Sequence, residues 1–239
     1  MIDLLEQERP VWLPGHAQGY HAFTYGWLAG ELIRRVDPQR RTIGEFIREE
    51  IADRLQTEFY IGLPQEFEQR VSPLIFTDIE RIMNRSMLAL YEFFNEARAH
   101  QAEIPAGNGI TNARSLARIF ASLIGNIDDR EDSRLLQPEI LQRATTLNTL
   151  PNEIDIIMKI PFPFGMGFML YEQDFPMFGS KSFGHTGAGG SIAFAAPAKN
   201  LSFAYVMNRV NLEPVTINNT RIGIILSRIG TMLDDNHLN

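Results

Sequence analysis

Apolar residues recur at three- and four-residue spacing through the first part of the chain, which is the period of an amphipathic helix. The first such stripe consists of Tyr25, Leu28, Ala29, Leu32, Ile33 and Val36. It predicts a helix that stops at Asp37-Pro38, because a proline disfavours helical conformation in the residue before it. We expect this stripe to be buried core, since an amphipathic face forms mainly to be covered by the rest of a domain.

Two capping boxes mark further helix starts, at Thr42 and at Thr77, each followed three residues later by a glutamate. The helices predicted after these boxes and later in the region cover residues 43–55, 77–94, 111–124 and a short stretch from Pro138. An apolar, β-leaning stretch lies between them at Phe59–Pro64. Residues 1–150 are therefore predicted to be a mainly helical region.

The pattern changes near residue 152, where short apolar runs suited to strands replace the helical stripes. These runs cover residues 155–160, 167–171, 191–196 and 201–207, with a hairpin turn at Pro197–Asn200 between the last two. A final amphipathic helix is predicted from about Asn219 to Leu233, its apolar face made of Ile222, Ile225, Leu226, Ile229, Met232 and Leu233. Helices, then strands, then one helix predict an α+β fold, in which residues 1–150 and 151–239 are two regions of one domain.

Composition narrows the class of protein. The chain has 239 residues, 44% of them hydrophobic, which is enough for a folded domain with its own core. It has no cysteine, which excludes a disulfide scaffold, a thiolate zinc site and a cysteine nucleophile. The net charge of −7 argues against nucleic acid as a partner. The chain contains no run of about 18 apolar residues, so no membrane span is predicted. Residues 1–10 contain no apolar signal core, which favours a cytoplasmic location.

Chemistry is suggested first by the segment from Phe183 to Gly190, which contains four glycines in its last seven residues and runs into a predicted strand. Glycines beside a strand let a ligand or another backbone approach closely, with N–H groups available for an oxyanion. The alternative is a merely flexible turn, and His185 within it is by itself as well explained by an ordinary satisfied polar residue.

The second candidate is the loop from Pro14 to Ala22, which carries a tyrosine and two histidines just before a helix N-terminus. The helix dipole there favours an anion, and we expect it to lower the pKa of the Tyr20 phenol. His16 and His21 together suggest a metal, but no third ligand is spaced nearby, so neither a metal nor a cofactor is expected.

Several further motifs stand in a definite order along the chain. They are Pro14-Gly15-His16, Tyr20-His21-Ala22, Tyr25–Gly30, the loop Pro105–Gly109, the helix start Ala113–Arg118, Phe164–Phe168 and His185-Thr186-Gly187. This order resembles that of the serine β-lactamase and penicillin-binding-protein superfamily, in its class C and esterase branch, whose members carry Pro-Gly-Thr, Tyr-x-Asn, a glycine loop and either Lys-Thr-Gly or His-x-Gly. The resemblance covers nearly all of the chain.

The resemblance implies a β-lactamase/transpeptidase-like fold with an antiparallel sheet and a C-terminal helix packed on it. It also implies acyl transfer through a serine acyl-enzyme, with a small ester or amide as substrate. Tyr20 would be the general base, His185 would hold the substrate carboxylate or the tyrosine oxygen, and the backbone N–H of Ala188 would be one oxyanion donor. His21, Thr186, Gly187 and Asn108 are the substrate-binding residues that the same resemblance implies.

The chain departs from the family at three motif positions and in one missing motif. His16 replaces the threonine of Pro-Gly-Thr, Ala22 replaces the asparagine of Tyr-x-Asn, and His185 replaces lysine, which favours an esterase over a β-lactamase. The missing motif is the larger departure, because no Ser-x-x-Lys exists: the three lysines, Lys159, Lys181 and Lys199, have Ile156, Phe178 and Ala196 at that spacing. The chain therefore looks like the C-terminal part of a family member, without its N-terminal strands.

Two hypotheses follow. The chain is either a portion of a serine hydrolase whose serine and lysine lie in other sequence, or a degenerate relative that binds ligands without chemistry. Absent strands would leave a sheet edge and an apolar face of the last helix uncovered, so we expect either self-association or an N-terminal half that covers them.

Overall fold

The computed structural model describes residues 1–76, 85–211, 215–216 and 218–235. Within them the chain forms two compact units. Unit 1 is drawn from Met1–Leu74, Ile79–Asn112 and Pro151–Phe162, and unit 2 from Ile75–Asp78, Ala113–Leu150 and Pro163–Asn239. Each unit therefore combines segments that are distant in sequence, and each is described here by itself.

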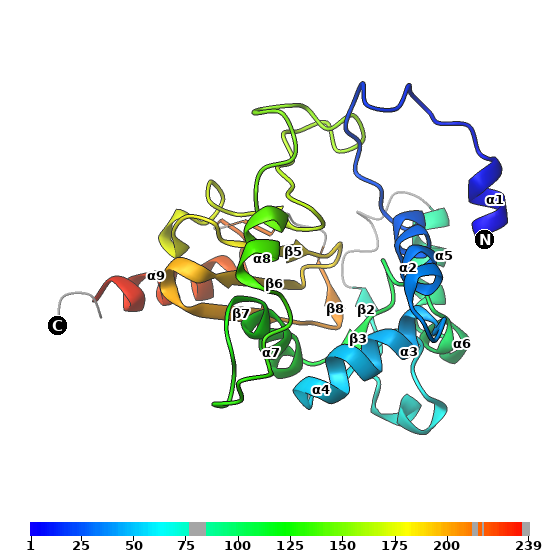
Figure 1. The fold of residues 1–239 in the computed structure, drawn as a ribbon, viewed down its shortest axis with the longest axis horizontal. Helices are drawn as coiled ribbons and strands as arrows, with labels where there is room; N and C mark the ends of the chain where they lie inside the picture. The colour runs from blue at the N-terminus through cyan, green and yellow to red at the C-terminus, as the bar shows by residue number, and fades with distance from the viewer. Residues whose placement is uncertain (77–84, 212–214, 217, 236–239) are drawn as a thin grey trace. The chain divides into compact units, whose positions relative to one another are not determined.

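Unit 1 is mainly helical. Its helices are α1 (Ile2–Gln7), α2 (Thr24–Val36), α3 (Ile43–Ile47), α4 (Asp53–Leu55), α5 (Arg85–Phe93) and α6 (Ala97–Gln101), with a π-helical turn at Arg48–Ala52 and a 3₁₀ turn at Gln65–Arg70 (Figure 1). Strands β1 (Phe59–Tyr60) and β3 (Ile110–Thr111) pair antiparallel. The capping box at Thr42 is confirmed, because Thr42 Oγ1 accepts the N–H of Glu45 at 3.2 Å and the Glu45 carboxylate accepts the N–H of Thr42 at 2.9 Å. The box at Thr77 lies outside the described residues.

Helix α2 corrects the expectation that its apolar stripe is core. Tyr25, Leu32 and Val36 are 52%, 66% and 79% exposed, whereas the buried positions are Gly26 and Gly30. A Cβ on Gly26 would lie 2.5 Å from the backbone nitrogen of Ala106, so only glycine allows this close approach. The most buried positions of the helix are therefore its small residues, whereas the rest of the predicted stripe, Leu28, Ala29 and Ile33, is only half-buried.

An ion-pair network stabilises the end of α2. The side chain of Asp37 is buried and pairs with the Arg41 guanidinium at 2.9 Å. Arg41 also reaches Glu49 and Glu50 on the following π-helical turn, at 2.9 and 2.8 Å. Hydrogen bonds from Arg41 hold the pKa of the Asp37 carboxyl at about 2, below its usual range. This network attaches the turn after α2 to the helical segment that follows it.

Unit 2 is built on an antiparallel four-stranded sheet in the order β4-β5-β6-β7. Its strands are β4 (Met169–Leu170), β5 (Phe183–Thr186), β6 (Ile192–Ala196) and β7 (Leu201–Tyr205), and its helices are α7 (Ala113–Ile124), α8 (Pro138–Ala144) and α9 (Gly223–Asp235). A short parallel pair, β2 (Ile75–Phe76) and β8 (Arg209–Val210), is also present. The predicted hairpin is confirmed: Pro197–Lys199 makes a 3₁₀ turn and Asn200 has φ of 46° before β7 begins.

Strand β6 is covered on both faces. Successive side chains of a strand point to opposite faces, and Ala195 packs with Phe183, Leu123 and Leu141 on the side of α7 and α8. On the other face Phe194 packs against aromatic rings at centroid distances of 4.8 to 6.4 Å, those of Tyr171, Phe175 and Phe178. All five residues of β6 are buried, which makes this strand the centre of unit 2.

Two parts of the pattern come out differently from the prediction. In α9 only part of the predicted face is covered, because Ile222 and Leu226 are buried while Ile225 and Met232 are 39% and 56% exposed. Residues 155–160 form a tight turn instead of a strand. The cause of that turn is Asp155, whose side chain caps it as described below.

Candidate functional site

Tyr20 lies in the loop of unit 1 that leads into α2. The indole of Trp12 donates to the Ala17 carbonyl at 2.9 Å, which folds the preceding loop back on itself. The Tyr20 ring packs edge-on against Phe162, with centroids 5.5 Å apart and planes at 87°. Burial raises the pKa of the Tyr20 phenol. The expectation that the helix N-terminus lowers this pKa is therefore wrong for the described chain, because desolvation is the cause that decides the direction.

The surface that receives this loop is the turn that begins at Asp155, a residue with 0% exposure. One carboxylate oxygen, Oδ1, accepts the backbone N–H groups of Ile157 and Met158, both at 2.8 Å. The Asp155 carbonyl accepts the N–H of Lys159 at 2.8 Å, and Lys159 has φ of 61°. An aspartate that bonds to the backbone two and three residues on favours a turn over a strand. This explains why the apolar run after Asp155 does not pair as a strand.

Gln18 connects the Tyr20 loop to this turn. Its main-chain carbonyl accepts the N–H of Ile156 at 3.0 Å, and its side-chain Nε2 donates to the Phe162 carbonyl at 2.9 Å. Sequence reasoning missed Gln18, Asp155 and Phe162 as parts of the site. The aspartate at the head of an apolar run is the one signal in the sequence that points to a turn there.

The other predicted residues of unit 1 are His21, just before α2, and Asn108, in the loop between α6 and β3. His21 is exposed and shares a hydrogen bond between its Nε2 and Thr24 Oγ1, the hydroxyl at the start of α2. Asn108 is buried, and its amide nitrogen donates to the carbonyls of Ala99 and Ala102 at 2.7 and 2.5 Å. Its Oδ1 accepts the N–H of Ile104 at 3.1 Å. All these contacts go to the main chain, so Asn108 holds its loop; its role in substrate binding stays a prediction.

The second group of predicted residues lies in unit 2, at the end of β5 and in the turn to β6. Here the segment with four glycines is part strand and part turn, because Phe183–Thr186 forms β5 itself. The N–H of Gly187 donates to the Ser191 carbonyl at 2.8 Å, and Gly189 and Gly190 have φ of 124° and 101°. Ala188 is exposed, and its N–H has no hydrogen-bond partner among the described residues. The turn therefore presents a backbone donor at its tip.

His185 is a largely desolvated histidine on β5. Its Nδ1 lies 2.6 Å from the Thr186 carbonyl, a geometry that requires an N–H on Nδ1 and leaves Nε2 as an acceptor in the neutral ring. Burial lowers the pKa of His185, and the Thr186 carbonyl opposes that effect. The Phe164 ring lies 6.1 Å from the imidazole. Thr186 itself directs its hydroxyl to the sulfur of Met169, at 3.5 Å. The burial of the ring therefore favours its neutral form.

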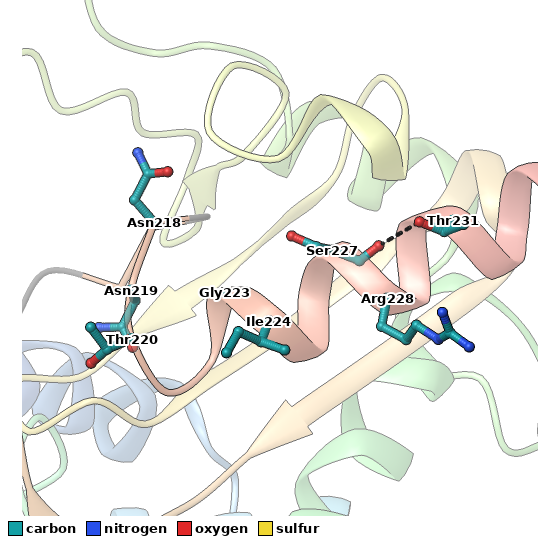
Figure 2. Close-up of a pocket in the computed structure, with 8 residues that line it drawn as sticks. All are labelled: Asn218, Asn219, Thr220, Gly223, Ile224, Ser227, Arg228 and Thr231. Carbon is teal, nitrogen blue, oxygen red and sulfur yellow. Dashed lines mark hydrogen bonds between the residues drawn. The ribbon is translucent and has the colours of Figure 1, made fainter.

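The described residues contain no group of three or more His, Asp or Glu side chains placed to hold a metal ion. None of their helices is long and apolar enough to cross a membrane. A shallow hollow of about 460 Å³ lies along the first turns of α9, between Asn218 and Thr231 (Figure 2). None of the predicted site residues lines it.

The predicted residues are thus collected in two groups, Tyr20, His21 and Asn108 in unit 1 and residues 185–188 in unit 2. Comparison with known proteins gives these groups a context. The family model described as Beta-lactamase matches residues 1–227. The chain belongs to the beta-lactamase family. The superfamily that the motif order suggested is thereby confirmed.

Individual relatives of this beta-lactamase family chain are longer than it is. Esterase/beta-lactamase LipL of Mycobacterium tuberculosis is 30% identical over 241 residues, a match that covers 90% of the chain and 54% of LipL. The structure of EstA from Arthrobacter nitroguajacolicus Rue61a is 26% identical with a TM-score of 0.83, over 98% of the chain and 64% of EstA. A penicillin-binding protein homologue from Caulobacter crescentus is 35% identical with a TM-score of 0.67, over 86% of the chain and 57% of that protein. The chain thus spans about half the length of the curated relative, and the predicted fold class is confirmed.

Proposed function

We propose that the chain is the part of a serine esterase that supplies the general base and one oxyanion donor, while the nucleophile comes from sequence outside these 239 residues. The observation that carries this proposal is the burial of His185, which favours a neutral imidazole at the position where β-lactamases have the lysine of Lys-Thr-Gly. The similarity to an esterase/beta-lactamase and to EstA supports the same class of reaction.

The electrostatics of His185 support an ester over a β-lactam as the substrate. A lysine at this position offers a full positive charge to the carboxylate of a β-lactam. His185 is less suited to this role, because burial lowers its pKa and Nδ1–H is engaged by the Thr186 carbonyl. Its Nε2 is suited to accept a hydrogen bond from a hydroxyl group. The preferred substrate is therefore an uncharged ester.

In the proposed reaction the serine Oγ–H transfers its proton to the Tyr20 phenolate as Oγ bonds to the ester carbonyl carbon. The oxyanion that forms accepts hydrogen bonds from the N–H of Ala188 and from that of the nucleophile. Collapse breaks the carbonyl–alkoxy bond, and the alcohol leaves with the proton from Tyr20. Water then repeats the sequence on the acyl-enzyme and releases the acid. His21, Thr186 and Gly187 would border the substrate, and Asn108 would hold the loop beside it.

This role for Tyr20 requires a cation from elsewhere. Burial raises the pKa of the phenol, so the described chain by itself disfavours the phenolate at neutral pH. The lysine of a Ser-x-x-Lys motif would oppose this effect by stabilising the negative charge. None of the three lysines in the chain belongs to such a motif. The nucleophile and the cation are therefore proposed to enter together on one segment.

Uncovered surface in unit 2 supports a partner segment. Strand β7 is the last in the sheet order, with β6 as its one partner among the described strands. On α9, Ile224 and Met232 are 73% and 56% exposed. We propose that an N-terminal half pairs with this edge and covers these side chains, and that the isolated chain otherwise self-associates. A monodisperse monomer that melts cooperatively and binds no hydrophobic dye would contradict this.

A catalytically inactive binding protein is the second candidate. It is favoured by Ala22, which replaces the amide of the family's Tyr-x-Asn, and by the lack of Ser-x-x-Lys. The coding sequence upstream of Met1 discriminates between the two: an in-frame Ser-x-x-Lys supports the esterase, and a stop codon or unrelated sequence supports the binding protein.

The enzyme hypothesis is tested in a chain that also carries Ser-x-x-Lys, by measuring kcat/KM on a short-chain ester. Tyr20→Phe keeps the ring against Phe162 and removes the proton acceptor, so we expect a loss of ~10²–10⁴-fold, about 3–5 kcal/mol of transition-state stabilisation. His185→Ala should cost on the order of tenfold. Tyr60→Phe, a partly buried tyrosine of the same unit, is the control and should keep full activity. Equal activity of Tyr20→Phe and the parent would refute the assignment of Tyr20.

The 239-residue chain alone gives a complementary test. Because it lacks Ser-x-x-Lys, it should show no covalent labelling by a fluorophosphonate and no burst with a p-nitrophenyl ester. Stoichiometric labelling of any serine in the folded chain would overturn the proposal that the nucleophile lies elsewhere.

A further inference from the structure

Three consecutive residues, Gln18, Gly19 and Tyr20, are attached to the segment 155–162 by different kinds of contact. Gln18 does so by hydrogen bonds, Gly19 by close packing and Tyr20 by its ring. All of these contacts lie within unit 1. The arrangement suggests that the position of Tyr20 is set by this segment, 137 residues away from Gln18 in the sequence.

Gln18 provides the polar attachment. The donation from its Nε2 to the Phe162 carbonyl fixes the orientation of the amide, because the flipped amide would oppose two oxygens. Its Oε1 is then buried without a hydrogen-bond partner in the described chain. A buried acceptor left unpaired costs free energy. The fold tolerates this cost while keeping the amide directed at Phe162.

Gly19 shows how tightly the loop is seated. A Cβ at this position would lie 2.5 Å from the Trp12 ring and 3.1 Å from Cγ1 of Ile157. The loop at Gly19 is therefore packed closely against both the indole of Trp12 and the side chain of Ile157, with no room for a side chain of its own. This close packing lies directly beside Tyr20, whose ring contacts Phe162 at the end of the same segment.

Phe162 closes the connection, because its carbonyl accepts from Gln18 and its ring packs against Tyr20 at 5.5 Å. We infer that Gln18 is a positioning residue for Tyr20, acting through Phe162 and the Asp155 turn. Gln18 and Tyr20, two residues apart, contact the same partner. The inference rests on the proposed role of Tyr20 for its catalytic meaning, but the positioning itself is independent of catalysis.

The test uses the 239-residue chain with tyrosine labelled with ¹³C at Cζ, and the Tyr20 resonance is identified by its loss in Tyr20→Phe. Gln18→Met keeps the length of the side chain and removes the amide. If Gln18 positions Tyr20, the ring becomes more exposed in this variant and the phenol titrates at lower pH than in the parent. Gln101→Met, an exposed glutamine of the same unit, is the matched control and should titrate as the parent does. An unchanged Tyr20 titration in Gln18→Met would overturn the inference.

Loss of the Tyr60 signal would show that Gln18→Met does not fold. In that case a second variant tests whether Gln18 positions Tyr20. In Gln18→Glu the protonated acid can donate to the Phe162 carbonyl, whereas the carboxylate cannot. The Tyr20 resonance should therefore match the parent at acidic pH and depart from it as the new carboxyl ionises. The parent over the same pH range controls for other carboxyl groups, Asp155 included. A Tyr20 resonance that follows the parent throughout contradicts the inference.

Activity separates this inference from the proposed function. In a chain that also carries Ser-x-x-Lys, Gln18→Met should lower kcat about tenfold, shift the pH profile of kcat and leave KM nearly unchanged. An inactive parent with a shifted Tyr20 titration in Gln18→Met would refute the esterase and support the positioning. An active parent with no shift of the titration would do the reverse.

Discussion

Replacement of Asp155 should destabilise unit 1 by an amount that depends on which atom is removed. Each hydrogen bond to a charged acceptor contributes about 1.5–3 kcal/mol, and Asp155 Oδ1 accepts two, both at 2.8 Å. The donors belong to Ile157 and Met158, which are 55% and 41% exposed, so water can reach part of what Asp155→Ala uncovers. We therefore expect a loss of about 2–4 kcal/mol for Asp155→Ala. Asp155→Asn keeps Oδ1 and should lose only about 1 kcal/mol.

Tryptophan fluorescence allows the loss of stability caused by the Asp155 substitutions to be measured for unit 1 alone. Trp12 and Trp27 are the two tryptophans of the chain, and both lie in unit 1. Equilibrium urea unfolding followed by tryptophan fluorescence therefore reports the free energy of unfolding of the unit that contains Asp155. Asp53→Ala, an exposed aspartate of the same unit, is the control and should change that free energy by less than about 0.5 kcal/mol.

Two outcomes would refute the reasoning. A loss below that of the control would mean that the carboxylate does not cap the turn. An equal loss in Asp155→Ala and Asp155→Asn would mean that Oδ1 is not the stabilising atom, and that the buried charge itself matters more than the two backbone contacts.

Three further predictions concern other parts of the chain. Burial lowers the pKa of His185, so as the pH falls the unfolded chain binds a proton there before the folded chain does. The contribution of His185 to stability should therefore be complete above pH ~6.5 and decrease as the pH falls below that value. His185→Gln should flatten this part of a Tm-against-pH curve. The pKa of Asp37 is about 2, so its contribution should be present above its ordinary value near 3.8 and disappear as the pH falls toward 2; acid unfolding of Asp37→Asn, followed by tryptophan fluorescence, should lack this step. Phe194→Ala removes a ring with 0% exposure and should cost about 3–5 kcal/mol in urea unfolding followed by circular dichroism, and a loss under about 1 kcal/mol would contradict the two-faced core of β6.

Periodicity located helices well but did not tell which face is buried. In α2 the apolar stripe is real, yet the helix packs through Gly26 and Gly30, because small residues allow close backbone approach to Ala106 and Ile43. Glycine contributes nothing to a hydrophobic pattern, so a face made of glycines is invisible to it. The prediction of a strand after Asp155 was wrong for a different reason: one capping carboxylate outweighs the strand preference of four apolar residues.

The motif residues of the candidate site could be predicted from the sequence, but the burial and the long-range contacts around them could not. The order of short motifs pointed to Tyr20 and His185, but each of these residues takes its electrostatics from burial. Burial raises the pKa of Tyr20 and lowers that of His185. The contact of Gln18 with Phe162 joins residues 144 positions apart. No local pattern encodes such a pair, because only the folded backbone brings the amide and the carbonyl together.

The central position of β6 in unit 2 determines how fast its backbone amide protons exchange with solvent. Its backbone is paired on both sides, to β5 and to β7, and all five of its side chains are buried. Amide protons of β6 should therefore exchange with solvent only through global opening of unit 2, whereas the N–H of Ala188, four residues before β6 begins, should exchange almost at once. The backbone donor that the proposed chemistry uses is thus tethered to the slowest-opening strand of the unit while remaining fully accessible itself. A steep gradient of protection over so few residues would let that donor be both well placed and open to a ligand.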